Sequence, residues 1–121
     1  MSAVKAPEEW KGSHVSTLDA LMFLREYEAR TGSLQVFIGY DDVRRFASFV
    51  DGVGVHLFLC GAHNPGFGEF LAWLRVRHGL SSGPWEEKFL ADAQGDHHLA
   101  MKRFLDECAE FRAGWQNRDP S

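Results

Sequence analysis

The chain has 121 residues, the length of one domain and enough to build a hydrophobic core without disulfides or metals. Hydrophobic residues make up 45% of it, which excludes an intrinsically disordered chain. The formal net charge of −4 argues against direct binding of nucleic acid, because proteins of that class present a basic face. A basic partner protein is compatible with the same charge.

Three features predict a cytoplasmic protein that is not held in a membrane. Residues 1–14 contain no apolar segment of the kind found in a secretion signal. No apolar run approaches the ~20 residues of a membrane span. The two cysteines, Cys60 and Cys108, each fall in an apolar helical stripe, which predicts buried free thiols in a reducing compartment.

The chain is expected to form a flexible N-terminal arm, one helical domain and a C-terminal tail, at residues 1–15, 16–115 and 116–121. The arm mixes proline, glycine and charge without a period, and Trp10 is its one anchor. Ser16, followed three positions later by Asp19, is typical of a helix N-cap. Gly32 is typical of the residue that ends such a helix.

Residues 33–60 admit two interpretations. The alternation of residues 53–60, opposite residues 34–40, would suit a β-hairpin. A helical register covers more residues, with spacings of three and four that include Val43, Phe46, Val50, Val53, Leu57 and Cys60. We therefore favour one helix and keep the hairpin as a minor alternative.

This helix would begin after Asp41 and Asp42, whose charges suit the positive end of a helix dipole, and would end at Gly61. Gly52 and Gly54 lie inside it, and each costs roughly 1 kcal/mol relative to alanine. Their presence predicts either a close helix crossing or a break in the helix.

The second half of the chain predicts three more helices. The first ends at Gly79, with Leu80 placed for the closing contact. Pro84 fits the first position of the second, which would run to Gly95. Asp96 would cap the third, whose apolar seam is Met101, Phe104, Cys108, Phe111 and Trp115. The predicted fold class is therefore all-α, a single-domain bundle of four to five helices.

The adjacent histidines His97 and His98 resemble the start of a metal or catalytic site, but their spacing favours the start of a helix. Neighbouring residues on a helix point about 100° apart, so the two rings cannot chelate one metal. The residues three and four positions later are Ala100, Met101 and Lys102, and none of them is a metal ligand. We expect no metal site.

Nucleophilic catalysis is no better supported. Cys60 and His56 are four positions apart and could touch, but we expect Cys60 to be buried, where a thiol is unreactive. No serine lies in a nucleophile elbow, and no glycine pattern matches a dinucleotide loop or a Walker loop. We expect no catalytic residues, no cofactor and no enzymatic activity.

The negative charge of the chain is concentrated in residues 84–111. This segment has seven acids against the three bases Lys88, Lys102 and Arg103, a balance of −4 that equals the net charge of the whole chain. The seven acids are Glu86, Glu87, Asp92, Asp96, Asp106, Glu107 and Glu110.

An acidic helical face of this kind is expected to steer a partner protein, because charge complementarity speeds association and selects partners. Asp41 and Asp42 would form a second, neighbouring patch. Trp85, together with Trp10 and Trp115, would supply rigid aromatic anchors if these side chains are partly exposed.

The segments "SFVDGV" (48–53) and "FLDECAEF" (104–111) carry a resemblance that extends over about residues 17–112. The chain resembles a family of small, mostly uncharacterised bacterial helical proteins. The family pattern has a first helix ending in Arg-Pro-Gly-Met-Tyr-Leu-Gly and a later helix carrying Phe-Leu-Asp-Gly-Tyr. The segment "RTGSLQVFIG" (30–39) departs from it by lacking the proline and by being longer.

The resemblance implies an immunity protein that binds and neutralises a cognate bacterial toxin. If that toxin is basic, such as a nuclease, the acidic side chains would stand in for phosphates. A monomer or a weak dimer is expected. The alternative is a homodimeric regulatory or scaffolding adaptor without catalytic activity, joined through an exposed apolar stripe.

Overall fold

The computed structural model describes residues 4–81 and 83–116, and every regular element within these ranges is helical. A short 3-10 helix lies in the N-terminal arm, at Glu8–Trp10. The α-helices are α1 (Thr17–Thr31), α2 (Gln35–Ile38), α3 (Val43–Leu59), α4 (Phe67–His78), α5 (Trp85–Asp92) and α6 (His97–Gln116). The prediction of an all-α bundle is confirmed. The predicted C-terminal tail lies outside the described residues beyond Gln116.

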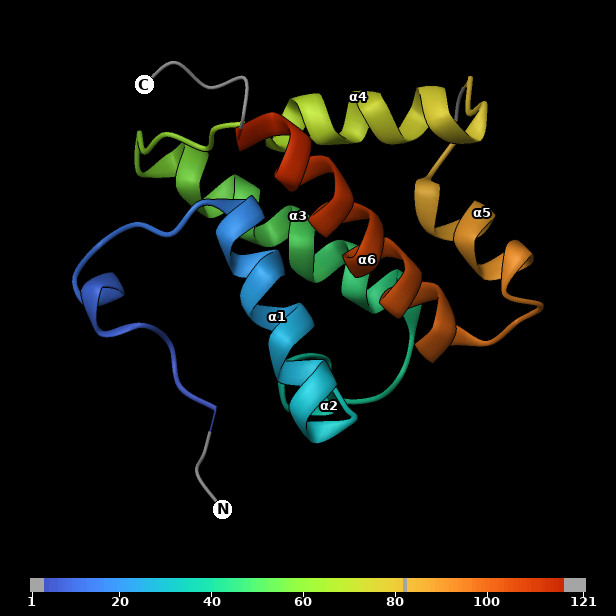
Figure 1. The fold of residues 1–121 in the computed structure, drawn as a ribbon, viewed down its shortest axis with the longest axis horizontal. Helices are drawn as coiled ribbons and strands as arrows, with labels where there is room; N and C mark the ends of the chain where they lie inside the picture. Colours follow the sequence, from blue (N-terminus) through green and yellow to red (C-terminus); the bar gives the residue numbers. More distant parts are fainter. Residues whose placement is uncertain (1–3, 82, 117–121) are drawn as a thin grey trace.

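Helix α6 is the central element, because it packs against α1, α3, α4 and α5. Figure 1 shows α1 and α6 lying side by side across α3, with α4 near the C-terminal end of α6 and α5 at the opposite side from α1. The N-terminal arm loops away from α1 in the same view. The Trp10 ring of the arm contacts the Phe23 ring of α1, with the ring centroids 6.1 Å apart.

The helix ends are set by local sequence, as predicted. The Ser16 hydroxyl accepts the Asp19 N–H at 3.2 Å and begins α1, and Gly32 ends the helix at φ 78°. Gly79 ends α4 at φ 65°, and the Leu80 N–H closes the turn on the Arg75 carbonyl at 2.8 Å. The spacing of caps along the chain therefore predicts the boundaries of these helices well.

Helix α3 settles the ambiguity of residues 33–60. Residues 53–59 are the last turns of one unbroken helix and residues 35–38 are a single helical turn, so the alternative hairpin at 34–40 and 53–60 is wrong. The Asp42 carboxylate caps α3 by accepting the backbone N–H of Arg44 at 2.8 Å and of Arg45 at 3.3 Å. This local cap favours the helix over a strand.

The two glycines of α3 have different surroundings. A Cβ on Gly54 would lie 3.7 Å from the Asn64 amide nitrogen and 3.9 Å from the Thr17 hydroxyl, which are ordinary van der Waals contacts with side chains. A Cβ on Gly52 would meet nothing within 4 Å. Neither glycine is required by a close approach, and neither breaks the helix.

Helix α5 is shorter than predicted. Pro84 is its N-cap and not its first helical residue, and the helix ends at Asp92. Gln94 and Gly95 then take positive φ values of 56° and 85°, which turn the chain sharply into α6. The apolar stripe continues one residue past the end of the helix, because Ala93 is also buried, and for this reason the predicted helix is too long.

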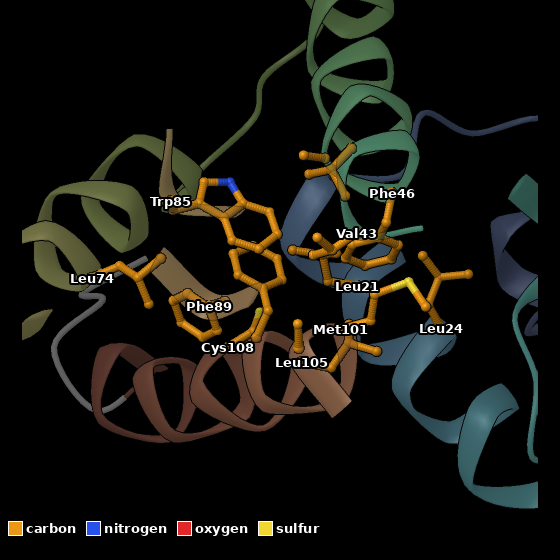
Figure 2. Close-up of a cluster of buried hydrophobic side chains, with 14 of the residues drawn as sticks. Leu21, Leu24, Val43, Phe46, Leu74, Trp85, Phe89, Met101, Leu105 and Cys108 are labelled. Atoms are coloured by element: carbon orange, nitrogen blue, oxygen red, sulfur yellow. The ribbon is translucent and has the colours of Figure 1, made fainter. Parts of the chain in front are cut away.

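The core is organised around the fully buried ring of Phe104 on α6. Trp85 of α5 stacks on this ring with centroids 3.8 Å apart. Phe46 of α3, at 5.9 Å, and Phe70 of α4, at 5.3 Å, meet it from other sides. Figure 2 shows Trp85, Phe89 and Phe46 directed toward this shared interior. One aromatic cluster thus joins four of the helices, and it fixes α5 and α6 relative to the rest.

Candidate partner-binding face

The acidic residues of the predicted docking face lie on α5 and α6, and each helix begins with some of them. Glu86 and Glu87 occupy the first turn of α5, where a helix dipole favours negative charge. Asp96 caps α6, because its carboxylate accepts the Leu99 N–H at 3.0 Å. The stretch from Asp96 to His98 therefore starts a helix, as the spacing predicted.

Arginines from other helices contact the carboxylates of this face. Arg44 of α3 binds Glu87 through both carboxylate oxygens, at 2.6 and 2.9 Å. The Arg25 Nε of α1 lies 3.0 Å from the Asp106 carboxylate. The Arg44–Glu87 hydrogen bonds lower the pKa of the Glu87 carboxyl and raise that of the Arg44 guanidinium.

Two further acids share the arginine of α4. The Arg77 guanidinium lies 3.0 Å from a Glu110 oxygen and 3.1 Å from a Glu107 oxygen. Glu107 also meets the His78 ring at 2.8 Å, and its side chain is only 16% exposed. Asp92 pairs within α5, with its carboxylate 3.2 Å from the Lys88 ammonium.

These contacts change the charge balance that the sequence predicts for the face. Residues 84–111 carry seven acids and three bases, a balance of −4, and the fold adds Arg25, Arg44 and Arg77, which brings it to −1. Asp106 faces α1 whereas Glu107 faces α4, so the acids are divided between two sides of α6. The face is a mosaic of paired charges and not a continuous negative field.

Trp85 is a core residue. Its side chain is 8% exposed and stacks on the interior ring of Phe104, so it presents little area to a partner. Trp10 and Trp115 are half-buried, and the Trp115 indole donates to Glu69 at 3.2 Å. The aromatic anchors expected beside the acidic residues are thus not provided by Trp85.

Asp41 and Asp42, the second predicted patch, belong to a cluster that we call the histidine corner: Glu28, Asp41, Asp42, His97 and His98. The His98 Nε2 lies 2.9 Å from a Glu28 oxygen, and its Nδ1 lies 3.6 Å from an Asp41 oxygen. The His97 Nδ1 accepts the Val43 N–H at 3.0 Å and lies 3.9 Å from Asp42. The corner joins α1, the start of α3 and the start of α6.

Two side chains of the corner have distinct environments. Burial alone would raise the pKa of the Asp42 carboxyl, but the hydrogen bonds from the Arg44 and Arg45 backbone outweigh it, and the pKa is lowered. Glu28 is buried, and sequence reasoning missed it. It follows Leu21 and Leu24 at spacings of three and four, so an acid on the buried seam of α1 was the available clue.

The expected burial of Cys60 is wrong. Cys60 is exposed, with its sulfur 3.7 Å from the His56 Nε2, whereas Cys108 is buried as predicted. Burial raises the pKa of the Cys108 thiol to about 12. Because Cys60 is exposed, the last buried residue of the α3 seam is Leu57.

The end of α3 also exposes three large apolar residues, a set that we call the α3 apolar patch. Phe58 is 80% exposed, Leu59 75% and Val55 55%. All three lie off the apolar seam of the helix, and this position was the sequence clue to their exposure. Clustered apolar side chains on a surface are typical of contact sites.

A groove of about 1070 Å³ separates the N-terminal arm from α1 and α6. Lys5 and Trp10 line it from the arm, Phe23 from α1, and Asp106 and Arg112 from α6. Both acidic and basic side chains line it, and Arg112 of α6 forms an ion pair with Asp19 of α1.

Among residues 4–81 and 83–116, no group of three histidine, cysteine, aspartate or glutamate side chains is arranged to hold a metal ion. Over the same described ranges, no helix combines the length and the apolar character needed to cross a bilayer. Comparison with protein-family models, curated proteins and solved structures finds no match to this chain.

Proposed function

We propose that this chain is an immunity-type protein that binds and neutralises a cognate bacterial toxin in the cytoplasm. Docking would use the acidic face of α5 and α6. The observation that carries the proposal is a set of carboxylates that helices hold in fixed positions while leaving them accessible. The exposed fractions of these side chains are 59% for Asp106, 54% for Glu110, 46% for Glu87 and 43% for Asp92.

The intramolecular ion pairs are compatible with such docking. An exposed pair contributes only about 0–1 kcal/mol to stability, so a lysine or arginine of a partner can replace the internal one at little cost. If the toxin is basic, such as a nuclease, the carboxylates would occupy positions that phosphates take in its substrate. Glu86, Asp96 and Glu107 would add negative charge beside these carboxylates, and Asp41 and Asp42 would form a neighbouring patch.

A growth assay tests the function. The product of the gene adjacent to this one would be expressed in a bacterial host with and without the protein. We expect that product to stop growth alone and to be tolerated when the protein is present, with a complex recovered from the rescued cells. Growth arrest that the protein does not relieve, without complex formation, would contradict the proposal.

Charge reversal tests the face. The triple variant Glu86→Lys, Glu87→Lys and Asp92→Lys is expected to lower the association rate constant about tenfold at low salt and to remove most of its salt dependence. The matched control is Glu8→Lys, Glu9→Lys and Glu26→Lys, which changes the net charge equally at exposed positions of the arm and α1. An equal loss in both variants would assign the effect to net charge and not to the face.

The α3 apolar patch favours a second candidate function, a homodimeric regulatory or scaffolding adaptor. Phe58 and Leu59 would meet their counterparts in a second copy and leave water together. Light scattering distinguishes the two functions. A dimer at micromolar concentration that Phe58→Asp converts to a monomer supports the adaptor, and a monomer in both samples supports the immunity-type function.

A further inference from the structure

The adjacent histidines at the start of α6 make hydrogen bonds of opposite kinds. His97 accepts: its Nδ1 receives the backbone N–H of Val43, the first residue of α3, at 3.0 Å. His98 faces acceptors on both sides, with Glu28 at 2.9 Å from Nε2 and Asp41 at 3.6 Å from Nδ1. The two rings therefore place opposite demands on protonation.

His97 holds α3 only while its Nδ1 carries a lone pair. This requires the neutral ring with its proton on Nε2. Protonation of Nδ1 would replace the acceptor with a second donor and would leave the Val43 N–H without this partner. Val43 is fully buried, so water cannot easily replace the lost bond.

His98 is suited to the protonated state. An imidazolium has an N–H on each ring nitrogen, and here each nitrogen faces a carboxylate. The Glu28 side chain is only 10% exposed, and among the described residues the buried Oδ1 of Asp41 has no hydrogen-bond partner. A neutral ring can donate to only one of the two carboxylates.

The charged neighbours of the pair come from every element around it. Glu28 of α1 and the loop residues Asp41 and Asp42 supply three negative charges beside the rings. Glu87 of α5 lies near His97 and is neutralised by Arg44 of α3. Lys102, one helical turn beyond His98, lines the groove that also contains Glu28. The immediate surroundings of the two rings are therefore acidic.

We propose that His97 and His98 form a pH-responsive joint at the start of α6. Acidification releases the N-terminus of α3 from His97 and at the same time strengthens the link between α6 and α1 at His98. Histidine is the side chain whose ordinary charge change lies between about pH 5 and 8, so the contacts of both rings are compared across that range. The joint depends on these contacts alone and is independent of the proposed partner.

Amide hydrogen exchange followed by NMR tests the release of α3. After correction for the intrinsic pH dependence, the Val43 amide is expected to exchange about tenfold faster at pH 5.5 than at pH 7.5, the order expected for loss of one buried hydrogen bond. In His97→Asn, the amide oxygen can take the place of Nδ1 and does not titrate, so the pH response should disappear. His63→Asn, at an exposed loop histidine, is the control and should keep it.

The strengthened link is tested in parallel. Exchange in the last turn of α1 is expected to slow about twofold on acidification, because ionised partners hydrogen-bond more strongly. His98→Gln should remove this gain, since its amide can donate to Glu28 but cannot acquire a charge. An unchanged gain in this variant would overturn the role of His98.

Two results would overturn the release of α3. The first is a Val43 amide equally protected at both pH values, or equally pH-sensitive in His97→Asn. The second needs no variant: ring nitrogen chemical shifts of the unmodified protein at pH 7.5 should show the His97 Nδ1 without a proton. A protonated Nδ1 at that pH would exclude the hydrogen bond on which the joint depends.

Discussion

Helices α3 and α6 carry the same kind of apolar seam, with residues spaced three and four apart, yet the seam of α6 is covered over a larger share of its residues than the seam of α3. On α6 the seam residues Met101, Phe104 and Cys108 are all buried. On α3 the cover ends at Leu57, and the next seam residue, Cys60, is exposed. The spacing identifies the face that can be buried but not how far neighbours extend over it.

The neighbours explain the difference. Helix α6 has α1, α3, α4 and α5 around it, and its seam meets rings from three of them. Helix α3 ends at Leu59, two residues after its last buried seam residue, Leu57, and the loop of residues 60–66 follows. The exposure of the α3 apolar patch has another cause, because Val55, Phe58 and Leu59 lie off the seam.

The sharpest test of the comparison replaces one phenylalanine in each helix by alanine. Phe104→Ala in α6 removes the ring at the centre of the aromatic cluster and is expected to lower the free energy of unfolding by about 3–5 kcal/mol. Phe58→Ala in α3 removes an 80% exposed ring and should change it by less than about 0.5 kcal/mol. Urea unfolding measures both, and similar losses would mean that the end of α3 is covered after all.

A second test concerns what ties the end of α3 to the rest of the fold. The Asn64 side chain accepts the Thr17 N–H and donates to the Thr17 hydroxyl, both at 2.8 Å, and so joins the loop after α3 to the start of α1. Asn64→Ala leaves the buried Thr17 groups unpaired and should cost about 2 kcal/mol.

The matched control is Asn64→Asp, whose carboxylate can accept from both groups because the Thr17 hydroxyl can rotate to donate. Its stability in urea should stay much closer to that of the unmodified protein. If Asp and Ala were equally destabilising, the loss would come from the loop conformation and not from the hydrogen bonds.

Local features of this fold could be predicted from sequence because they depend on neighbours in the chain. The caps at Ser16, Asp42 and Asp96 each bind a backbone N–H two or three residues away. Their effect on the backbone therefore does not depend on the tertiary fold. The helices that these residues cap begin where the pattern predicts.

The contacts of the candidate site could not be predicted in the same way. Glu87 pairs with Arg44 across 43 positions, and His98 with Glu28 across 70. A count of charges along the sequence assigns these acids to an open negative face, whereas their partners depend on how the helices cross. The stacking of Trp85 on Phe104 has the same origin, because only the fold brings these two rings together.

A smaller and opposite effect is expected inside α3. Gly52→Ala should raise the free energy of unfolding by up to about 1 kcal/mol, because alanine is the better helix former and its Cβ meets nothing within 4 Å. Gly32→Ala is the contrasting control, since φ there is 78° and alanine is strained in that conformation. Thermal unfolding should move in opposite directions for the two, and a destabilising Gly52→Ala would indicate a partner over the middle of α3.

The smallest effect on stability is expected at Cys60, the exposed cysteine of the α3 seam. Cys60→Ser at the exposed end of α3 should change the free energy of unfolding by less than about 0.5 kcal/mol, yet it should remove the thiol that reacts rapidly in the folded protein.

The remaining thiol, Cys108, should react only on unfolding, because burial raises its pKa to about 12. Between the ordinary pKa of a thiol and this value only the unfolded chain ionises at Cys108, so its contribution to stability should fall as the pH rises through that window. Titration with a chromophoric disulfide at pH 8 checks the pattern: two rapidly reacting thiols would mean that α6 is no better covered than α3.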